Sequence, residues 1–481
     1  MIRKRKSRLS QLKEIAVIAI PVAFQNLLST TGSMVDTMML ATLGELTVSA
    51  VSMCAQFSTL FLNCYWGFVA GGTLFVTQYW GAGDEKGIRR SYGISLCMIV
   101  SIGMIFGILS VGFPRLVMGI YTNNPDVRAV GISYLCIVGW MFPIQSMTVA
   151  MSMLLRATEH PRIPLVGGIL SVLTNCLCNY ILIFGHFGAP VLGFRGAALG
   201  TLAASCMNLA VLVVFVVIRS IPYALEFHRC FSWDRSFASE YFRRSSMMLI
   251  NECGMGFGNT MINAVLGRQS AVAIAAIAIY RTMESMIWAF FTGFSTAGSI
   301  IIGKEVGAGN HETAQEKTRF IVYLTSTFVF FNCCCVIALH VPLFTLLGLS
   351  GESFAICRNL CLAYCIIGPI RLGNWQHIDC FRSGGDPLFC TVVDVSSLYM
   401  LVIPSVYIAH FVFRAPFYVI FLLAYWDEPV RYCLMQRHLY SRKWIKPVTD
   451  KGLATIDTFR EKYHVTPGYP FLDAVKRKME R

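Results

Sequence analysis

The chain has 481 residues, of which 55% are hydrophobic and only 14% are charged, and its mean hydropathy is +0.59. Soluble domains carry about 25% charged residues, so this composition excludes a soluble globular protein and indicates a chain with several membrane spans. The net charge of +14 does not indicate nucleic-acid binding, because most of the 40 Lys and Arg residues fall in alternate connections and in the tail.

This distribution of basic residues follows the positive-inside pattern of membrane proteins. It predicts that both termini are cytoplasmic and that the protein is a multi-pass protein of the plasma or inner membrane. The basic N-terminus, MIRKRKSR, resembles the start of a signal peptide. The apolar run after it is too long for one and lacks a small-residue cleavage site, so we expect a retained cytoplasmic end.

Apolar runs of helical length alternate with short polar connections, and no alternating strand pattern is present. We therefore predict an all-α polytopic membrane protein with twelve transmembrane helices. The first six are predicted at residues 13–40, 47–79, 91–114, 130–155, 163–185 and 196–219. The second six are predicted at residues 245–266, 271–303, 318–341, 355–381, 388–411 and 415–436.

These helices form two sets, which predict two pseudo-symmetric six-helix lobes. The N-lobe comprises residues 1–219 and the C-lobe residues 245–436. Residues 220–244 are polar, aromatic and basic, and we expect them to form a cytoplasmic linker. Residues 437–481 form a basic cytoplasmic tail that has too few apolar residues for a core of its own, so an appendage is expected.

An internal repeat relates the two sets. The segment at residues 66–84, WGFVAGGTLFVTQYWGAGD, aligns without a gap on residues 292–310, TGFSTAGSIIIGKEVGAGN, at an offset of 226. The same offset carries Arg156 onto Arg382. Each half has an even number of predicted spans, so the halves are related by an axis along the membrane normal. Repeated halves are typical of transporters that bind substrate between the halves and work by alternating access.

The first predicted helix contains one carboxylate, Asp36, within an otherwise uncharged segment from about Ile15 to Leu43. An uncompensated charge at the bilayer centre costs roughly 2.5 to 3.5 kcal/mol, so Asp36 must face protein or a water-filled cavity. A proton or a metal cation would be a suitable partner there. Asn259 stands at the corresponding place in the second half, so only the first half keeps the acid.

Several motifs, taken in order, resemble the multidrug and toxic compound extrusion (MATE) family of cation-coupled antiporters. They are IAIPVAFQNLLSTTGSMVDTMMLATLG, TQYWGAGD, LLRATEHP, NCLCNYILIFG, GAALGT, INECGMGFGNT, IGKEVGAGN and CFRSGGDP, and they cover about residues 13–449. The resemblance implies two lobes around a V-shaped cavity. It also implies export of organic, often cationic or amphipathic compounds, driven by entry of Na⁺ or H⁺.

The resemblance also implies a cation site in the N-lobe, formed by Asp36, Asn175, Asn179 and Thr201. Asn175 and Asn179 are four residues apart on one helix, so both amides can reach one point. Some family members carry an acid where this chain has Asn179. A site with a single carboxylate suits a proton or a monovalent metal such as Na⁺ on Asp36 and Asn179, and the identity of the ion stays open.

In the C-lobe, the resemblance matches Glu252 to a family glutamate, whereas Arg371 stands where one branch of the family has an acid. An arginine there would neutralise Glu252 through a charge-assisted hydrogen bond. We predict a substrate cavity lined by Gln25, Glu252, Arg281, Glu284 and Arg371. Arg281 and Glu284 are three residues apart on one helix and can form an ion pair.

The ends of the predicted helices carry further charges. Arg156 and Arg382, at twin positions, are expected to cap the last carbonyls or to bridge elements within each lobe. Asp379 is expected to form a solvated pair with Arg382. Pro143 and Pro369 occupy matching depths and predict kinks in their helices.

Three more acids lie close to the C-lobe helices. Asp394 has His377 and Arg371 as candidate partners, and a role without a partner is equally open. Asp427 and Glu428 begin the basic C-terminal end and are expected at the membrane interface.

The chain has no His-Glu-x-x-His, P-loop or Ser-His-Asp pattern, so we expect a transporter rather than an enzyme. No cofactor is expected beyond the coupling Na⁺ or H⁺; the expected partners are a small organic substrate and lipid, and the expected state is a monomer. The 18 cysteines lie mostly in apolar runs without zinc spacing. The alternative is a lipid-linked sugar flippase of the same wider superfamily, which should carry more cationic residues in the first lobe's cavity.

Overall fold

The structure is a computed structural model that describes residues 8–225, 232–346 and 351–466, and these residues form helices and no strands. The helices of the first half are α1 (Arg8–Ala41), α2 (Glu45–Ala82), α3 (Glu85–Gly112), α4 (Pro114–Tyr121), α5 (Pro125–Val138), α6 (Met141–Ala157), α7 (Arg162–Phe184), the 3₁₀ turn η1 (His186–Gly188), α8 (Phe194–Ile218) and α9 (Pro222–Leu225).

The second half begins with α11 at Arg235, inside the predicted linker. Its elements are α11 (Arg235–Leu266), α12 (Ala271–Gly307), α13 (His311–Ala338), α14 (His340–Leu346), α15 (Gly351–Ser383), α16 (Pro387–Ser396), the π-helix η2 (Ser397–Val402), α17 (Ile403–Tyr407), the π-helix η3 (Ile408–Val412), α18 (Phe417–Leu423), α19 (Glu428–Ser441) and α20 (Asp450–Lys462).

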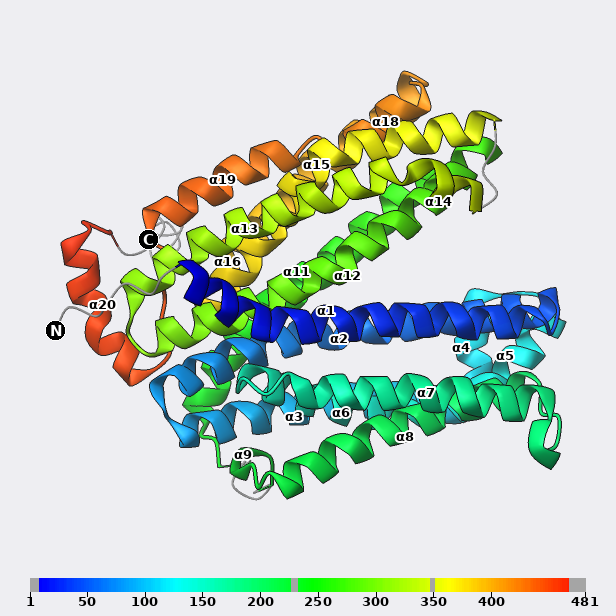
Figure 1. The fold of residues 1–481 in the computed structure, drawn as a ribbon, viewed down its shortest axis with the longest axis horizontal. Helices are drawn as coiled ribbons and strands as arrows, with labels where there is room; N and C mark the ends of the chain where they lie inside the picture. Colours follow the sequence, from blue (N-terminus) through cyan, green and yellow to red (C-terminus); the bar gives the residue numbers. More distant parts are fainter. Residues whose placement is uncertain (1–7, 226–231, 347–350, 467–481) are drawn as a thin grey trace, which may run out of the picture.

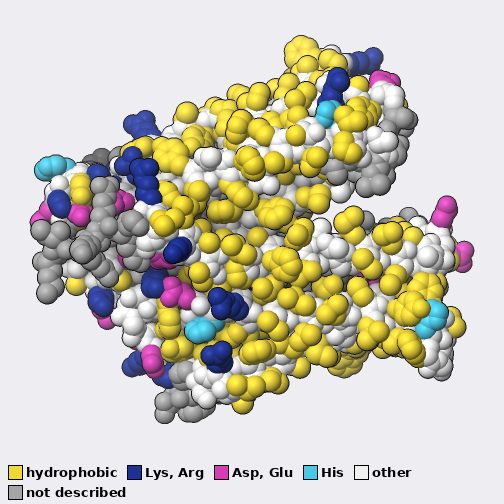
Figure 2. Space-filling view, viewed as in Figure 1, with side chains coloured by type: hydrophobic (Ala, Val, Ile, Leu, Met, Phe, Trp, Pro, Cys, Tyr) yellow, Lys and Arg dark blue, Asp and Glu magenta, His cyan; other side chains and the backbone are white. Residues whose placement is uncertain are grey.

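The long helices form two bundles, the N-lobe with α1 to α8 and the C-lobe with α11 to α19, which meet at one end and spread apart at the other (Figure 1). Lys and Arg side chains gather at the end where the bundles meet, and hydrophobic side chains cover most of the visible flanks (Figure 2). This surface is the one expected of helices surrounded by lipid, with a basic face on one side of the membrane.

The predicted all-α membrane fold is confirmed, but the count of twelve spans is not reached. Among the described residues, nine helical runs are long and apolar enough to cross a membrane, or ten if the bent pair α5 and α6 is one span. The predicted spans at 245–266 and 415–436 fall short. The first carries Asn251, Glu252, Asn259 and Asn263 within its helix, and the second is divided between α18 and α19.

The fourth predicted span bends by 47° between α5 and α6. The break lies at Gly139 and Trp140, just before Pro143. A proline ring clashes with the carbonyl four residues earlier, which here belongs to Gly139, so the predicted kink is present and its cause is Pro143. Its repeat mate Pro369 does not interrupt its helix, because α15 runs through Pro369 without a break, and the kink there stays a prediction.

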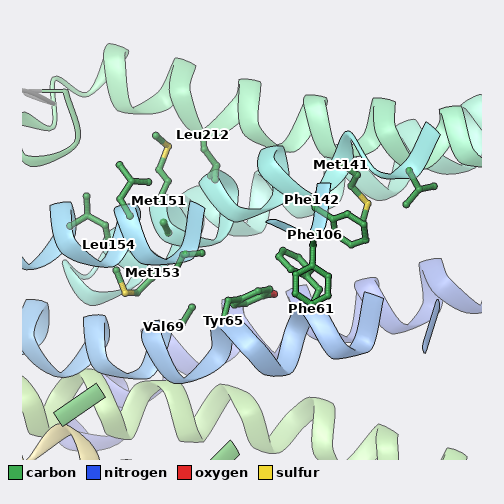
Figure 3. Close-up of a cluster of buried hydrophobic side chains, with 14 of the residues drawn as sticks. Phe61, Tyr65, Val69, Phe106, Met141, Phe142, Met151, Met153, Leu154 and Leu212 are labelled. Atoms are coloured by element: carbon green, nitrogen blue, oxygen red, sulfur yellow. The ribbon is translucent and has the colours of Figure 1, made fainter. Parts of the chain in front are cut away.

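Each lobe has its own hydrophobic core. In the N-lobe, the rings of Phe61 and Phe142 lie 4.9 Å apart and those of Phe61 and Phe106 lie 5.4 Å apart, next to Tyr65 (Figure 3). Aromatic pairs of this kind add about 0.5 to 1.5 kcal/mol beyond the burial of their area. Two further hydrophobic clusters join the lobes: one lies between the start of α1 and α12, and the other lies between α2, α3 and α11.

The narrow end is closed by a reciprocal contact between α2 and α12. A methyl group added at Gly81 would lie 2.0 Å from the carbonyl oxygen of Lys304, and one added at Gly307 would lie 1.9 Å from that of Gln78. Gly81 and Gly307 are repeat mates, as are Gln78 and Lys304, so the contact follows the pseudo-symmetry. The Lys304 ammonium also pairs with Glu159 of the N-lobe at 2.7 Å.

The described part of the tail packs against this closed end and is not a free appendage. Trp444 is fully buried and donates its indole N–H to Gln315 at 3.0 Å. The backbone N–H of Val448 donates to Gln78 Oε1 at 2.8 Å, and the Thr449 hydroxyl donates to the Gly307 carbonyl at 2.8 Å. Residues of the tail therefore bond to both lobes. The predicted basic N-terminal segment and the last prolines of the tail lie outside the described residues.

Candidate functional site

Asp36 on α1 is held by amides of α7. The Asn179 side chain donates its Nδ2–H to Asp36 Oδ1 at 2.6 Å and lies 3.3 Å from Asn175 Oδ1. Asn179 is fully buried, and its own Oδ1 has no hydrogen-bond partner in the structure. A half-buried carboxylate thus lies beside an amide that has an unused acceptor, which is a group that a proton donor or a cation can satisfy.

Two cavities of the N-lobe meet at Asp36. One has a volume of about 330 Å³ and lies among α1, α6, α7 and α8, and the other has about 390 Å³ and lies among α1, α2 and α5. Asp36 and Thr201 line both, and Asn175 lines the first. The Thr201 hydroxyl donates to the Ala197 carbonyl of its own helix at 3.0 Å, and its side chain also bonds to the Tyr134 hydroxyl.

Asp36 is the only charged residue among those that line the two cavities. The other polar side chains that line the 330 Å³ cavity are hydroxyls and amides: Ser29, Ser33, Gln145, Thr148, Ser171, Asn175, Thr201, Ser205 and Asn208. In the described part of the chain, no Lys, Arg or His lies within ion-pair distance of Asp36. Its negative charge has only neutral neighbours to stabilise it, so a bound cation or proton would neutralise it.

The charges of the C-lobe are paired, and the pairs differ from the predicted ones. Glu252 accepts a hydrogen bond from Arg382 at 2.9 Å, and Arg382 also donates to Asn251 at 2.8 Å. The prediction that Arg371 neutralises Glu252 is therefore wrong. Of the two roles expected for Arg382, the structure shows the bridge within its lobe and not the helix cap, because its guanidinium reaches from α15 to α11.

Arg371 instead joins two other acids. It donates to Glu284, and its Nε lies 3.7 Å from Glu428 Oε1. Arg281 donates to Asn263 at 2.5 Å rather than to Glu284, so the predicted pair between Arg281 and Glu284 is not formed. Packing of α15 against α12 brings Arg371 to Glu284 and takes the place of the pair within one helix.

Asp394 is fully buried and is bound by Arg431, whose guanidinium lies 2.5 Å from Asp394 Oδ1. Asn251 donates to the other oxygen of Asp394 at 3.1 Å. Neither candidate partner, His377 or Arg371, is used. His377 donates its Nδ1–H to the Gly373 carbonyl at 2.7 Å.

Arg431 also lies 3.7 Å from Asp427 and 3.4 Å from Glu428. Both acids are only 4% exposed, so the prediction that they lie at the membrane interface is wrong. Sequence reasoning missed Arg431 as a functional neighbour. The signal was present in the segment WDEPVR, where acids stand three and four residues before an arginine, the spacing of neighbours on one helix.

These groups line a C-lobe cavity of about 260 Å³. Of the predicted substrate residues, Arg281, Glu284 and Arg371 line it. Glu252 is turned toward Arg382 instead, and Gln25 lies against Gly168 of α7.

A smaller cavity of about 100 Å³ lies between the lobes and is lined by Arg156, Asp379 and Arg382 together with uncharged residues of α2 and α12. Asp379 accepts a hydrogen bond from the Ser295 hydroxyl at 2.5 Å. The predicted solvated pair of Asp379 with Arg382 is therefore wrong, because both side chains belong to the interior between α12, α15 and α11. Arg156 lines the same cavity from the opposite lobe.

Comparisons with known proteins agree with this architecture. The MatE family model matches residues 21–181 and again residues 248–408, an offset of 227 at both ends. The probable multidrug resistance protein YoeA of Bacillus subtilis is 21% identical over 85% of this chain and 89% of its own length. The probable multidrug resistance protein NorM of Rhizobium meliloti is 25% identical over 57% of this chain and 59% of its own.

Solved structures show the same fold. A MATE protein in the straight conformation superposes with a TM-score of 0.78 at 15% identity, covering 92% of this chain and all of that one. The outward-facing conformation of a multidrug resistance MATE family transporter gives 0.77 at 15% identity, with the same coverage. Since the family model matches once in each lobe and covers more than half of the chain, this chain belongs to the MATE family of multidrug efflux transporters.

Proposed function

We propose that the protein is a secondary antiporter that exports organic, cationic or amphipathic compounds in exchange for Na⁺ or H⁺, by alternating access of its two lobes. The observation that carries the proposal is the state of Asp36, a half-buried carboxylate at the junction of two cavities that has no basic partner among the residues the structure describes. A cation that binds there in one conformation more tightly than in another shifts the balance between them, which is the requirement for coupling.

The residues around Asp36 support a specific exchange. When Asp36 is charged, it accepts the amide N–H of Asn179. When it takes up a proton, its new O–H needs an acceptor, and rotation of the Asn179 amide presents the unused Oδ1. A bound Na⁺ would use the same oxygen with those of Asp36 and Asn175. Either event satisfies an acceptor whose isolation costs about 1 to 3 kcal/mol.

The arrangement of the lobes supports the direction of transport. The lobes spread apart at the end opposite the cluster of Lys and Arg side chains (Figures 1 and 2). The positive-inside rule puts the basic end and both termini in the cytoplasm, so the cleft opens outward in this conformation. This is the state in which an exporter releases its substrate and takes up the coupling ion.

The flippase alternative finds no support in the two cavities at Asp36. That function calls for cationic residues in the N-lobe, and the residues that line these two cavities include none; Arg156 is the N-lobe cation that lines the smaller cavity between the lobes.

The test is ethidium efflux from proteoliposomes driven by a pH or a Na⁺ gradient. We expect wild-type protein to require one of the two gradients and Asp36→Asn to lose gradient-driven efflux while inserting normally. The matched control is Asp126→Asn, which removes an exposed carboxylate in the first turn of α5. Efflux by Asp36→Asn at the wild-type rate would refute the proposal.

A further inference from the structure

The small cavity between the lobes lies directly on the open side of the α2–α12 contact. Its walls come from α2 and α6 on one side and from α12 and α15 on the other. Trp66, half exposed, is the lining residue of α2 that lies farthest along the helix from Gly81. A cavity of about 100 Å³ holds several water molecules, since about 10 to 15 Å³ is enough for one. The cavity therefore has room for a polar head group, while the body of a larger compound would remain in the cleft.

The three charged residues of this cavity are not equally satisfied. Arg382 is bound by Glu252 and Asn251, and Asp379 is bound by Ser295. Arg156 has one hydrogen bond, from its Nε–H to the Ser152 carbonyl of its own helix at 3.2 Å. No carboxylate of the described residues forms an ion pair with it. One guanidinium thus faces the cavity without a counterion.

The repeat explains why Arg156 lacks a counterion. Arg156 and Arg382 are repeat mates, but the residue that corresponds to Glu252 is uncharged at every offset: Asn26 at 226, Gln25 at 227, and Ser29 at the offset of 223 that pairs Asp36 with Asn259. Asn26 donates to Thr292 at 2.6 Å, and Gln25 lies against Gly168. The N-lobe arginine has therefore lost the acid that neutralises its C-lobe twin.

We propose that Arg156 binds a carboxylate group of the transported compound at the floor of the cleft. A guanidinium offers two parallel N–H donors to a carboxylate, and such charge-assisted pairs are the stronger hydrogen bonds in proteins. The substrate class then includes organic compounds that carry an acid group beside their apolar or cationic part, with Asp379 across the cavity to meet a positive group. This inference rests on the proposed export function.

Two dyes that differ in one group test the site. Rhodamine 110 carries a free carboxyl, and rhodamine 123 is its methyl ester. We expect wild-type protein in detergent to bind rhodamine 110 roughly tenfold or more tightly than the ester, as measured by fluorescence anisotropy. Arg156→Gln should bind both dyes equally, Arg156→Lys should keep part of the preference, and Arg89→Gln, on the basic end of α3, should keep all of it.

Equal binding of the two dyes by the wild type, binding of neither, or a preference that survives in Arg156→Gln would overturn the proposal. Millimolar inorganic phosphate gives a further arm. Retained preference in phosphate supports an organic carboxylate as the occupant, and its loss shows that a free oxyanion fills the site, which contradicts a substrate subsite. Failure of the export function itself has a different signature, the absence of gradient-driven efflux of either dye from proteoliposomes.

Discussion

The cavities of the two lobes derive from one repeated unit, but the charged side chains that line them differ: the N-lobe charge has no ion-pair partner, whereas the C-lobe charges form ion pairs. In the N-lobe, Asp36 is the single charge on two cavities and has an amide as its partner. In the C-lobe, Arg371 and Arg431 are shared among four acids. A charge with neutral neighbours can exchange an ion, whereas paired charges hold helices together and resist removal of either member. From this difference we propose that coupling belongs to the first lobe and that the second lobe holds a structural network.

The largest effect should come from breaking the C-lobe network. Arg431→Met leaves Asp394 buried without its cation, and we expect the free energy of unfolding to fall by roughly 3 to 5 kcal/mol. Thermal unfolding in detergent can be followed with a thiol-reactive dye, since Cys357, Cys380 and Cys390 are buried. Adding Asp394→Asn should recover most of the loss. Unfolding of the single variant at the wild-type temperature would show that the network is not structural.

A second experiment tests the contact between α2 and α12, where the two lobes contribute equivalent glycines. Gly81→Ala and Gly307→Ala each put a methyl group about 2 Å from a carbonyl oxygen of the opposite lobe, so both should loosen the closed end and destabilise the fold by roughly 1 to 3 kcal/mol. Labelling of a cysteine introduced at the buried Thr77 should become faster. The control is Gly112→Ala, where the added methyl group meets nothing within 4 Å. Faster labelling and lower stability in only one of the two variants, Gly81→Ala or Gly307→Ala, would contradict a pseudo-symmetric contact.

A third experiment examines a C-lobe pair outside the membrane. Asp386, in the turn after α15, is buried, which opposes ionisation, but hydrogen bonds from His438 at 3.0 Å and Lys446 at 2.8 Å lower its pKa overall. A carboxyl whose pKa is lower in the folded state contributes stability above its unfolded pKa of about 3.9, and this is lost as the pH falls through the folded value.

We therefore expect the Asp386 contribution to the docking of the tail to be constant from about pH 8 to pH 5 and to disappear only in stronger acid. Asp386→Asn should weaken docking at every pH, by about 1 to 3 kcal/mol. Tryptic cleavage after Lys451 reports the undocked tail. If the wild-type tail became open to trypsin near neutral pH because Asp386 takes up a proton there, the lowered pKa assigned to Asp386 would be contradicted.

The smallest effect on stability should follow removal of the N-lobe charge. Asp36→Asn keeps a side chain that can bond to Asn179, and the change removes a charge without a cationic partner. We expect the free energy of unfolding to change by less than about 1 kcal/mol, far less than in Arg431→Met. Thermal unfolding of the two variants side by side gives the comparison. A large loss in Asp36→Asn would mean that Asp36, too, is structural.

The sequence predicts well the features that depend on a single helix or on the internal repeat. The spacing of Asn175 and Asn179 puts both amides on one face, and the structure brings Asn179 to Asp36. The Gly-Ala-Gly motifs predict tight turns, and Gly83 and Gly309 have φ values of 75° and 79°, which a left-handed turn requires. The role of these residues in ion coupling stays a prediction.

Pairings between helices could not be predicted. Several arginines of the C-lobe could pair with Glu252. Its partner is Arg382, 130 residues away in the sequence, because α15 packs against α11. Arg371 and Asp394 show the same limit, since the crossing of long helices fixes which side chains meet and hydrophobic periodicity does not encode it. Gly81 and Gly307, the first glycines of the two Gly-Ala-Gly motifs, show the same limit, because they form the contact between the lobes.

The most direct test of the central claim is a count of cations bound by purified protein. Proton uptake across neutral to acidic pH and binding of radioactive Na⁺ should be measured for wild type, Asp36→Asn and the control Asp126→Asn. The account predicts that Asp36→Asn binds one cation fewer, with the loss appearing in one of the two assays, and that the control matches the wild type. Equal binding by Asp36→Asn and wild type in both assays would contradict it.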